Sequence, residues 1–254
     1  MKLIIGNWKM FPSSLKEGKE IVSGIKKVAR NMKRTKVIVC PPTLFVQPLL
    51  LSVGKSKSIA VGAQDAFCAD EGAHTGETSP KALRSIGVSH VILGHSERRL
   101  LGETNELVSK KVSQAIRNKL TVVLCVGEKS RDEAGEYFNE VRNELRQSLH
   151  GFPHTASKQL IIAYEPIWAI GLHALRPATP EDFHQMSILI RKELVEHFGK
   201  IAAFKVPVLY GGSVDEQNAT GFLKEGGADG LLIGRVSLDP KKLGAIIQLA
   251  EHIR

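Results

Sequence analysis

The stretch HVILGHSERRLLGETNELVSKKVSQAIRNKLTVVLCVGE, residues 90–128, contains two short apolar runs separated by a segment with helical spacing. The runs, residues 90–94 and 121–127, are rich in Val, Ile and Leu with little polar alternation, which is typical of strands covered on both faces in a parallel sheet. Between them, residues 105–118 place their apolar members on one face of a helix. The stretch therefore predicts a strand, a crossover helix and a second parallel strand.

The same unit recurs along the chain. Amphipathic segments separate the runs, and Thr179–Pro180 and Asp239–Pro240 each supply a helix cap followed by Pro at the first helical position. Such alternation indicates a closed barrel or a doubly wound open sheet. The apolar runs are residues 2–8, 36–40, 58–64, 90–94, 121–127, 160–166, 206–212 and 229–234.

The chain has 254 residues, a length that fits either one large domain or two small ones. No G-x-G-x-x-G fingerprint follows the first run, and no Pro/Gly/Ser-rich linker divides the sequence. A (β/α)₈ barrel of about 250 residues has the usual size for that architecture. We therefore expect residues 1–254 to form a single (β/α)₈ domain of the α/β class, with a closed parallel sheet.

The charge balance bears on the partner. The formal net charge is +9, which favours an anionic partner, and part of the excess lies in KKVARNMKRTK, residues 26–36. That segment also has the pattern of the polar side and end of a helix. Nucleic-acid binding would need a clustered groove with stacking aromatic residues, and aromatic residues make up only 6% of the chain. We expect a small anionic substrate and no nucleic acid.

The cysteines and the N-terminus bear on the compartment. Cys40, Cys68 and Cys125 are widely spaced and form no metal-type pair, so neither a zinc site nor a disulfide scaffold is indicated. The apolar run in MKLIIGNWKM is too short for a signal peptide, and no stretch approaches the length of a membrane span. We expect a cytoplasmic protein without metal or membrane partner.

Polar residues follow the ends of most apolar runs. In (β/α)₈ barrels the active site lies at the carboxyl ends of the strands. These side chains are therefore expected to converge on one mouth of the barrel. They are Asn7, Lys9, Gln64, Asp65, His95, Glu97, Glu128, Glu165 and Ser213, and the glycines Gly212 and Gly234 stand at the ends of the last two runs.

His95 and Glu165 are the candidate proton-transfer groups. His95 stands where a strand becomes a helix, so backbone N–H groups can bond one ring nitrogen and favour a neutral imidazole that donates to a substrate oxygen. Glu165 ends an apolar strand, where partial desolvation makes a carboxylate a better base. Taken singly, His95 could be structural, and Glu165 could be a surface residue or half of an ion pair. Lys9 and Asn7 could stabilise a developing oxyanion.

Two glycine-rich turns predict a phosphate site. YGGSV, residues 210–214, and DGLLIGRVSL, residues 229–238, place glycines and a serine after the last two runs. At this position barrels often bind phosphate on backbone amides and the start of a short helix. A single glycine-rich turn usually means only a tight bend, but two in succession indicate phosphate.

These residues together resemble the triosephosphate isomerase family. The motifs follow the family in order across almost the whole chain: GNWKM, GAQD, GAHTGETSP, LGHSERR, GET, CVGE, AYEPIWAIG and YGGSV. The resemblance implies a TIM barrel that interconverts dihydroxyacetone phosphate and glyceraldehyde 3-phosphate through an enediolate, in glycolysis and gluconeogenesis. It implies no metal or organic cofactor.

The resemblance also implies a role for each site residue. Glu165 would move the proton between two carbons, while His95 would polarise the carbonyl and shuttle protons between oxygens. Lys9 and Asn7 would stabilise negative charge, with Glu97 supporting them from close by. Gly171, Ser213, Gly234 and Arg235 would form the phosphate site.

A lid and a dimer are implied as well. Residues 166–178 resemble the family's mobile lid, with hinges at residues 166–168 and 176–178. Residues 72–80 resemble a loop that enters the partner subunit's site, with Thr75 at its tip, which implies a homodimer.

The chain departs from the family pattern at three places. Leu172 to Leu175 make the lid tip two residues longer than usual, and Phe11 stands where Asn is usual. Arg235 replaces a glycine; its backbone N–H can still serve, while its guanidinium could reach the phosphate or project to solvent. These changes leave open an isomerase of a four-carbon ketose phosphate, such as erythrulose phosphate. A non-catalytic barrel is a further alternative, opposed by the intact set of base, imidazole, amide and cation.

Overall fold

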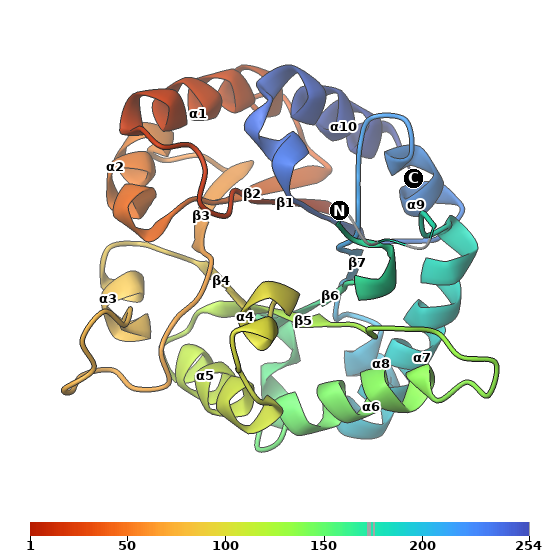
Figure 1. The fold of residues 1–254 in the computed structure, drawn as a ribbon. Helices are drawn as coiled ribbons and strands as arrows, with labels where there is room; N and C mark the ends of the chain where they lie inside the picture. The colour runs from red at the N-terminus through yellow and green to blue at the C-terminus, as the bar shows by residue number, and fades with distance from the viewer. Residues whose placement is uncertain (172–173, 175, 254) are drawn as a thin grey trace.

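The structure is a computed structural model that describes residues 1–171, 174 and 176–253. The described residues form eight strands that pair in chain order, and the last strand closes on the first (Figure 1). Every neighbouring pair is parallel, including β1 with β8, where Ile4 faces Leu231. The strands are β1 (Lys2–Asn7), β2 (Thr35–Cys40), β3 (Ile59–Ala63), β4 (His90–Leu93), β5 (Thr121–Val126), β6 (Leu160–Tyr164), β7 (Val208–Tyr210) and β8 (Gly230–Ile233).

Each strand lies within its predicted apolar run, except that β2 begins one residue earlier. The helices form a ring around the strands, as Figure 1 shows. The predicted (β/α)₈ barrel is therefore confirmed. The helices are α1 (Leu15–Ala29), α2 (Thr43–Val53), α3 (Pro80–Ser85), α4 (Ser96–Leu100), α5 (Asn105–Arg117), α6 (Tyr137–Ser148), α7 (Pro180–Phe198), α8 (Lys200–Ala203), α9 (Ala219–Lys224) and α10 (Pro240–His252), with short 3₁₀ turns η1 (His154–Gln159), η2 (Ile167–Ala169) and η3 (Arg235–Leu238).

The strands are apolar on both faces because each face packs on a different core. On β5, Val123 and Cys125 point into the barrel, while Val122 and Leu124 pack outward against the helices. This explains why the runs show no polar alternation. The thiol of Cys40 also lies inside the barrel, where burial raises its pKa to about 12 and keeps it protonated at neutral pH.

Two helix starts confirm the caps read from the sequence. Thr179 Oγ1 accepts a hydrogen bond from the Asp182 N–H at 3.2 Å, and the Asp182 carboxylate accepts one from the Thr179 N–H at 2.9 Å. Asp239 caps α10 in the same way, accepting from the first backbone N–H groups of that helix. These caps fix where α7 and α10 begin, and so how the loops before them leave the barrel mouth.

Lys111 lies on the apolar face of α5 and is buried, although it carries a charge. Its ammonium group bonds both oxygens of Asp65, at 2.8 and 2.9 Å, and also contacts Glu103. A buried cation requires such partners, because its desolvation is otherwise uncompensated. Among the described helices, none has the length and apolar character needed to span a membrane.

Candidate active site

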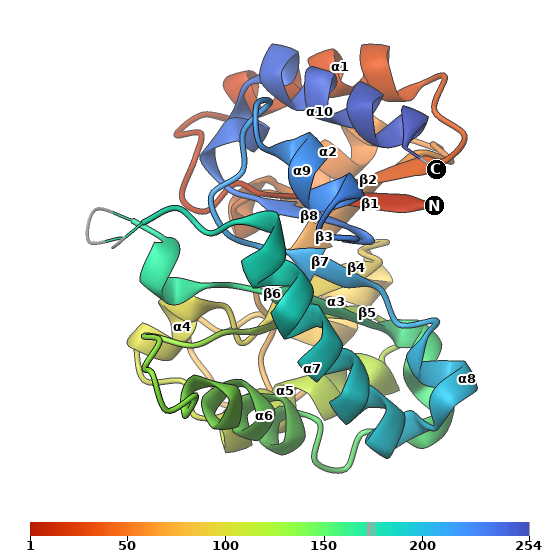
Figure 2. The same cartoon turned by 90° about the vertical axis from the view of Figure 1, so that its right-hand side faces the viewer.

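The two proton-transfer candidates follow β4 and β6. Figure 2 shows α4 and η2, which come after these strands, at the end of the barrel opposite to the N-terminus. His95 is the N-cap residue of α4, so its ring lies against the first turn of that helix. Glu165 comes directly after β6, and its N–H donates to Val126 O at 2.9 Å, which continues the β5–β6 ladder. Both side chains are buried.

The imidazole of His95 and the carboxylate of Glu165 face each other. Nε2 of His95 lies 3.1 Å from Oε1 of Glu165, and Oε2 of Glu165 accepts from the Ser96 N–H at 2.9 Å. The Glu97 N–H donates to His95 Nδ1 at 3.2 Å. Because Nδ1 accepts a hydrogen bond, the proton of a neutral imidazole lies on Nε2. The helix start thus fixes a tautomer whose Nε2–H can be donated to a substrate oxygen.

Lys9 reaches the same place from β1 through an unusual backbone. Its φ is +55°, in the left-handed region that side-chain-bearing residues seldom occupy. Asn7 Oδ1 accepts from the Lys9 N–H at 3.1 Å, and Gln64 Nε2 donates to the Lys9 carbonyl at 2.8 Å. Backbone strain of this kind persists only where neighbours enforce it, and it is common at functional sites. The Lys9 ammonium pairs with Glu97 at 2.7 Å.

One cavity of about 700 Å³ joins these residues to the predicted phosphate site. That volume is in the usual range for a small-molecule site. The structure therefore places nine of the predicted site residues on one cavity, while Gln64 and Asp65 line an adjoining cavity and Thr75 lines neither. The predicted residues that line it are Asn7, Lys9, His95, Glu97, Glu165, Gly171, Ser213, Gly234 and Arg235.

The phosphate end of the cavity is built from the turns after β7 and β8. The Gly211 N–H donates to Tyr164 O at 2.8 Å, which ties the first turn to β6. A Cβ on Gly212 would lie 2.3 Å from the Tyr210 hydroxyl, so only glycine fits there. The backbone N–H groups of Gly212 and Ser213 have no acceptor among the described residues. These groups are suited to bind an anion.

Glu128 does not join the others at the mouth. Its carboxylate is fully buried and Oε1 accepts from the Tyr164 hydroxyl at 2.7 Å, from Trp168 Nε1 at 2.7 Å and from Arg131 Nε at 3.0 Å. The expectation that every strand-end polar group converges on the substrate is therefore wrong for Glu128. Through its bond to Trp168, the Glu128 carboxylate instead holds the first turn of the predicted lid.

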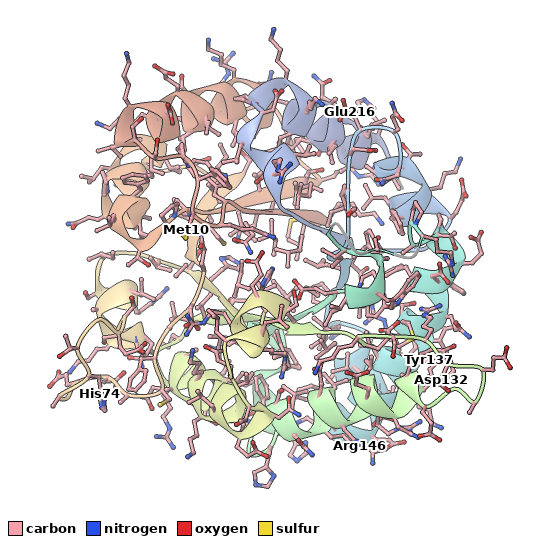
Figure 3. The ribbon with its side chains drawn as sticks, in the orientation of Figure 1. Met10, His74, Asp132, Tyr137, Arg146 and Glu216 are labelled. Carbon is pink, nitrogen blue, oxygen red and sulfur yellow. The ribbon has the colours of Figure 1, made fainter. Side chains whose placement is uncertain are left out.

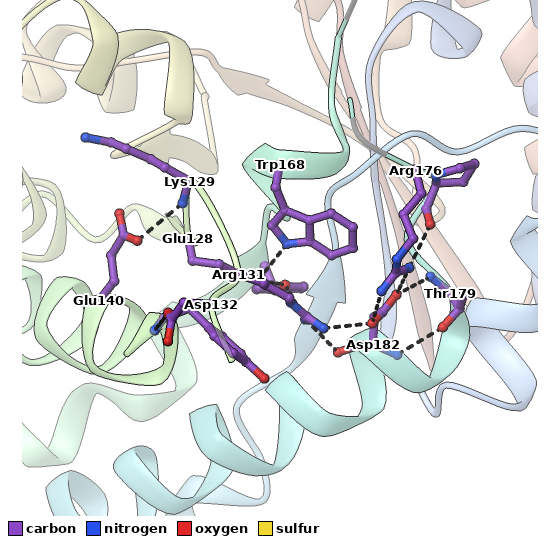
Figure 4. Close-up of polar contacts among 12 residues, drawn as sticks. Glu128, Lys129, Arg131, Asp132, Glu140, Trp168, Arg176, Thr179 and Asp182 are labelled. Carbon is purple, nitrogen blue, oxygen red and sulfur yellow. Dashed lines mark hydrogen bonds and ion pairs between the residues drawn. The ribbon is translucent and has the colours of Figure 1, made fainter. Parts of the chain in front are cut away.

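Figure 4 shows how this network continues to the second predicted hinge. The guanidinium groups of Arg131 and Arg176 lie 4.8 and 4.7 Å from the Trp168 ring centre, and both bond the Asp182 carboxylate. Burial alone would raise the pKa of Asp182, but bonds from Arg176 and Thr179 and the charge of Arg131 lower it to about 2. Leu172, His173 and Leu175 of the predicted lid tip lie outside the described residues.

Several residues of the site carry no signal in the sequence. Ile170 and Leu232 form apolar walls of the cavity, and nothing in their runs separates them from ordinary core residues. Cys125 lies beside Glu165 inside the barrel; burial, followed by the charge of Glu165, raises the pKa of its thiol. Within the described part of the chain, no group of three His, Cys, Asp or Glu side chains is arranged to hold a metal ion.

Known proteins are similar to this chain along almost its whole length. The sequence profile of the family described as "Triosephosphate isomerase" matches residues 2–250. A protein of that name from Moorella thermoacetica is 38% identical over 247 residues, covering 96% of this chain and 97% of the relative. One from Dictyoglomus thermophilum is 36% identical over 251 residues, covering 97% and 98%. One from Citrifermentans bemidjiense is 38% identical over 257 residues, covering 98% of each.

Proposed function

The chain belongs to the triosephosphate isomerase family, and from the geometry of its cavity we propose how its own residues carry out that family's reaction. The reaction interconverts dihydroxyacetone phosphate and D-glyceraldehyde 3-phosphate by moving one proton between adjacent carbons. The observation that supports the assignment of residues is the pair formed by His95 Nε2 and Glu165 Oε1, 3.1 Å apart in one cavity.

We propose that Glu165 is the base. Its carboxylate exchanges its bonds to Ser96 and His95 for the carbon-bound proton next to the substrate carbonyl, and later returns a proton to the neighbouring carbon. The Nε2–H of His95 polarises the carbonyl and moves protons between the two oxygens. Lys9 and Asn7 stabilise the negative charge of the enediolate, and Glu97 holds the Lys9 ammonium at 2.7 Å. These steps use side chains alone and need no cofactor.

The phosphate group is assigned to the other end of the cavity. Backbone N–H groups of Gly171, Ser213, Gly234 and Arg235 are proposed to bind it, with residues 166–178 closing as a lid. An enediolate next to a phosphate can eliminate that group. Fixing the phosphate and excluding water therefore protect the intermediate.

The substrate assignment is tested by comparing a triose phosphate with a four-carbon ketose phosphate. Arg235 at the phosphate end and the two extra residues of the lid tip are the features that favour a larger substrate. Family membership predicts that kcat/KM for D-glyceraldehyde 3-phosphate exceeds that for erythrulose phosphates, since specificity is a ratio of these values. An equal or higher value for the four-carbon substrate would contradict the triose assignment.

We also propose a homodimer. A second cavity of about 360 Å³ adjoins the active site, sharing Asn7, Lys9, His95 and Glu97, and Leu101 lies on its wall. The segment of residues 72–79 projects from the barrel beside α3, and Figure 3 shows His74 at its outer end. We propose that this loop, with Thr75 at its tip, enters the second cavity of the partner.

Exposed apolar side chains support the pairing. Leu101 on the wall of this cavity is 80% exposed, and Met10 and Leu44, which follow the lining residues Lys9 and Thr43 in sequence, are 89% and 86% exposed. Apolar side chains exposed to this extent are typical of an interface. Sedimentation equilibrium should give twice the chain mass for the wild type and a weaker dimer for Thr75→Arg. The matched control is Thr155→Arg, at an exposed position on η1. A monomeric wild type would overturn this part of the proposal.

Residues 1–254 are proposed to act as one catalytic domain in the cytoplasm. Cys40, Cys68 and Cys125 are all free thiols, which fits a reducing compartment.

A further inference from the structure

Arg235 places a second cation on the cavity, at its phosphate end. It is the first residue of η3, directly after Gly234, and its side chain is exposed at the mouth. Other arginines near the mouth already form ion pairs: Arg98 pairs with Glu103 at 2.7 Å and Arg176 with Asp182 at 2.6 Å. No described residue forms an ion pair or hydrogen bond with the Arg235 guanidinium. Its charge is therefore available to a ligand.

The cavity is lined by more carboxylates than cations, so the charge of Arg235 matters for binding an anion. The carboxylates that line it are Glu97, Glu165 and Asp215, while the cations are Lys9 and Arg235. Lys9 is already paired with Glu97 at 2.7 Å. A phosphate monoester is largely dianionic at neutral pH. Without Arg235, a dianionic substrate would enter a cavity dominated by negative charge, and Coulomb repulsion would weaken its binding.

The turn that carries Arg235 also contacts the reacting end of the cavity. A Cβ placed on Gly234 would lie 3.7 Å from Lys9 Cε, so the turn that carries Arg235 packs against the stem of the catalytic lysine. Ser213 lines the same cavity from the turn after β7, which pairs with β8. A phosphate bound between these two turns is within the region that a long, flexible guanidinium can reach.

We propose that the Arg235 guanidinium binds the substrate phosphate directly, and that it sets the affinity for the phosphodianion without taking part in proton transfer. The planar fork of donors on arginine matches two phosphate oxygens at once, which a lysine ammonium cannot do. The proposal rests on the assigned isomerase site, since it places the substrate phosphate at the end of the cavity formed by Ser213 and Gly234.

The test uses inorganic phosphate as the ligand, so that it does not depend on turnover. Calorimetric titration should show Arg235→Ala binding phosphate about tenfold more weakly or worse, which is the loss expected for a charge-assisted hydrogen bond. Arg235→Lys should fall between the two, because it keeps the charge and loses the fork. The KM for glyceraldehyde 3-phosphate should rise in parallel, with kcat changed by less than about threefold.

Arg30→Ala is the matched control. It removes the same charge from an exposed position that follows α1, at the opposite end of the barrel, and should change phosphate affinity by less than about twofold. Wild-type phosphate affinity in both Arg235→Ala and Arg235→Lys would overturn the proposal. If the wild type binds phosphate through Arg235 and fails to isomerise triose phosphates, the assigned reaction fails and the binding role of Arg235 stands.

Discussion

Glu165 is only 2% exposed, and its carboxylate oxygens are bonded to His95 and to the Ser96 N–H. Both partners belong to the start of α4, so a single helix terminus orients the imidazole and holds the proposed base. The same terminus donates to His95 Nδ1 from the Glu97 N–H at 3.2 Å. A cationic imidazole would have no acceptor nitrogen for that bond. The geometry of the proposed catalytic pair therefore follows from where one short helix begins.

His90 gives a pH prediction at the residue scale. It is buried at the start of β4, where burial, followed by the charge of Lys36, lowers its pKa to about 3. An unfolded histidine has a pKa of about 6.5. Between these values the unfolded chain binds a proton that the folded chain does not. Stability should therefore fall as the pH drops below about 6.5, by up to about 1.4 kcal/mol per pH unit from this residue.

Urea unfolding at a fixed protein concentration checks this. From pH 6.5 to pH 5, the wild type should lose about 1.6 kcal/mol more than His90→Gln. His184→Gln, at an exposed position on α7, is the control and should follow the wild type. Parallel pH profiles for wild type and His90→Gln would show that His90 is not the group responsible.

At the scale of elements, the contacts of Arg176 tie the second predicted hinge to α7 and to Trp168. These contacts are present while Glu165 is bonded to Ser96, the bond that Glu165 gives up for substrate in the proposed mechanism. We therefore assign them to the open state of the proposed lid. Removing them with Arg176→Ala should favour the closed state. Because the lid must also open to release product, kcat and KM should fall together, by about three- to tenfold for an ion pair and a cation–π contact.

Steady-state kinetics provides the measurement. Arg176→Lys retains the charge opposite Asp182 and should recover part of the effect, since it loses only the fork and some of the stacking. A rise in KM at constant kcat would show that Arg176 holds the closed lid instead.

Strands and helices can be predicted from the sequence wherever the signal that forms them lies within a few residues. The apolar runs and the caps at Thr179 and Asp239 act over a few residues, and they located strands and helix starts. His95 and Glu165 are far apart in the sequence, yet each follows the end of a strand, so the barrel topology brings them to one mouth.

The rest could not be predicted because it depends on packing between distant segments. Glu128 has the sequence pattern of a rim carboxylate, but Tyr164 and Trp168 bind and enclose it in the folded chain. The position of Lys111 on an apolar helical face does not identify its ion-pair partners, Asp65 and Glu103.

At the scale of the whole molecule, barrel closure depends on one close approach. A Cβ on Gly230 of β8 would lie 2.0 Å from Leu3 O of β1, across the pair that closes the sheet. Gly230→Ala must therefore push these strands apart. We expect a loss of unfolding free energy above about 3 kcal/mol, in the range seen when a close-packed backbone is forced to move.

Chemical denaturation of Gly230→Ala and of Gly18→Ala checks this. In Gly18→Ala the new Cβ would meet Leu49 and Trp8 at an ordinary 3.5 Å, inside α1, where alanine is favoured over glycine. That control should be at least as stable as the wild type. Equal stability of the two variants would mean that the β1–β8 seam tolerates widening.

The most direct test of the central claim, that the Glu165 carboxylate carries the proton, follows the reaction in D₂O by NMR. The wild type should place deuterium on carbon 1 of dihydroxyacetone phosphate formed from glyceraldehyde 3-phosphate. Glu165→Gln should abolish both turnover and deuterium uptake, and Glu165→Asp should lower kcat by about 100-fold or more with little change in KM. Glu20→Gln, at an exposed position on α1, should behave as the wild type. Deuterium uptake at the wild-type rate in Glu165→Gln would contradict the account.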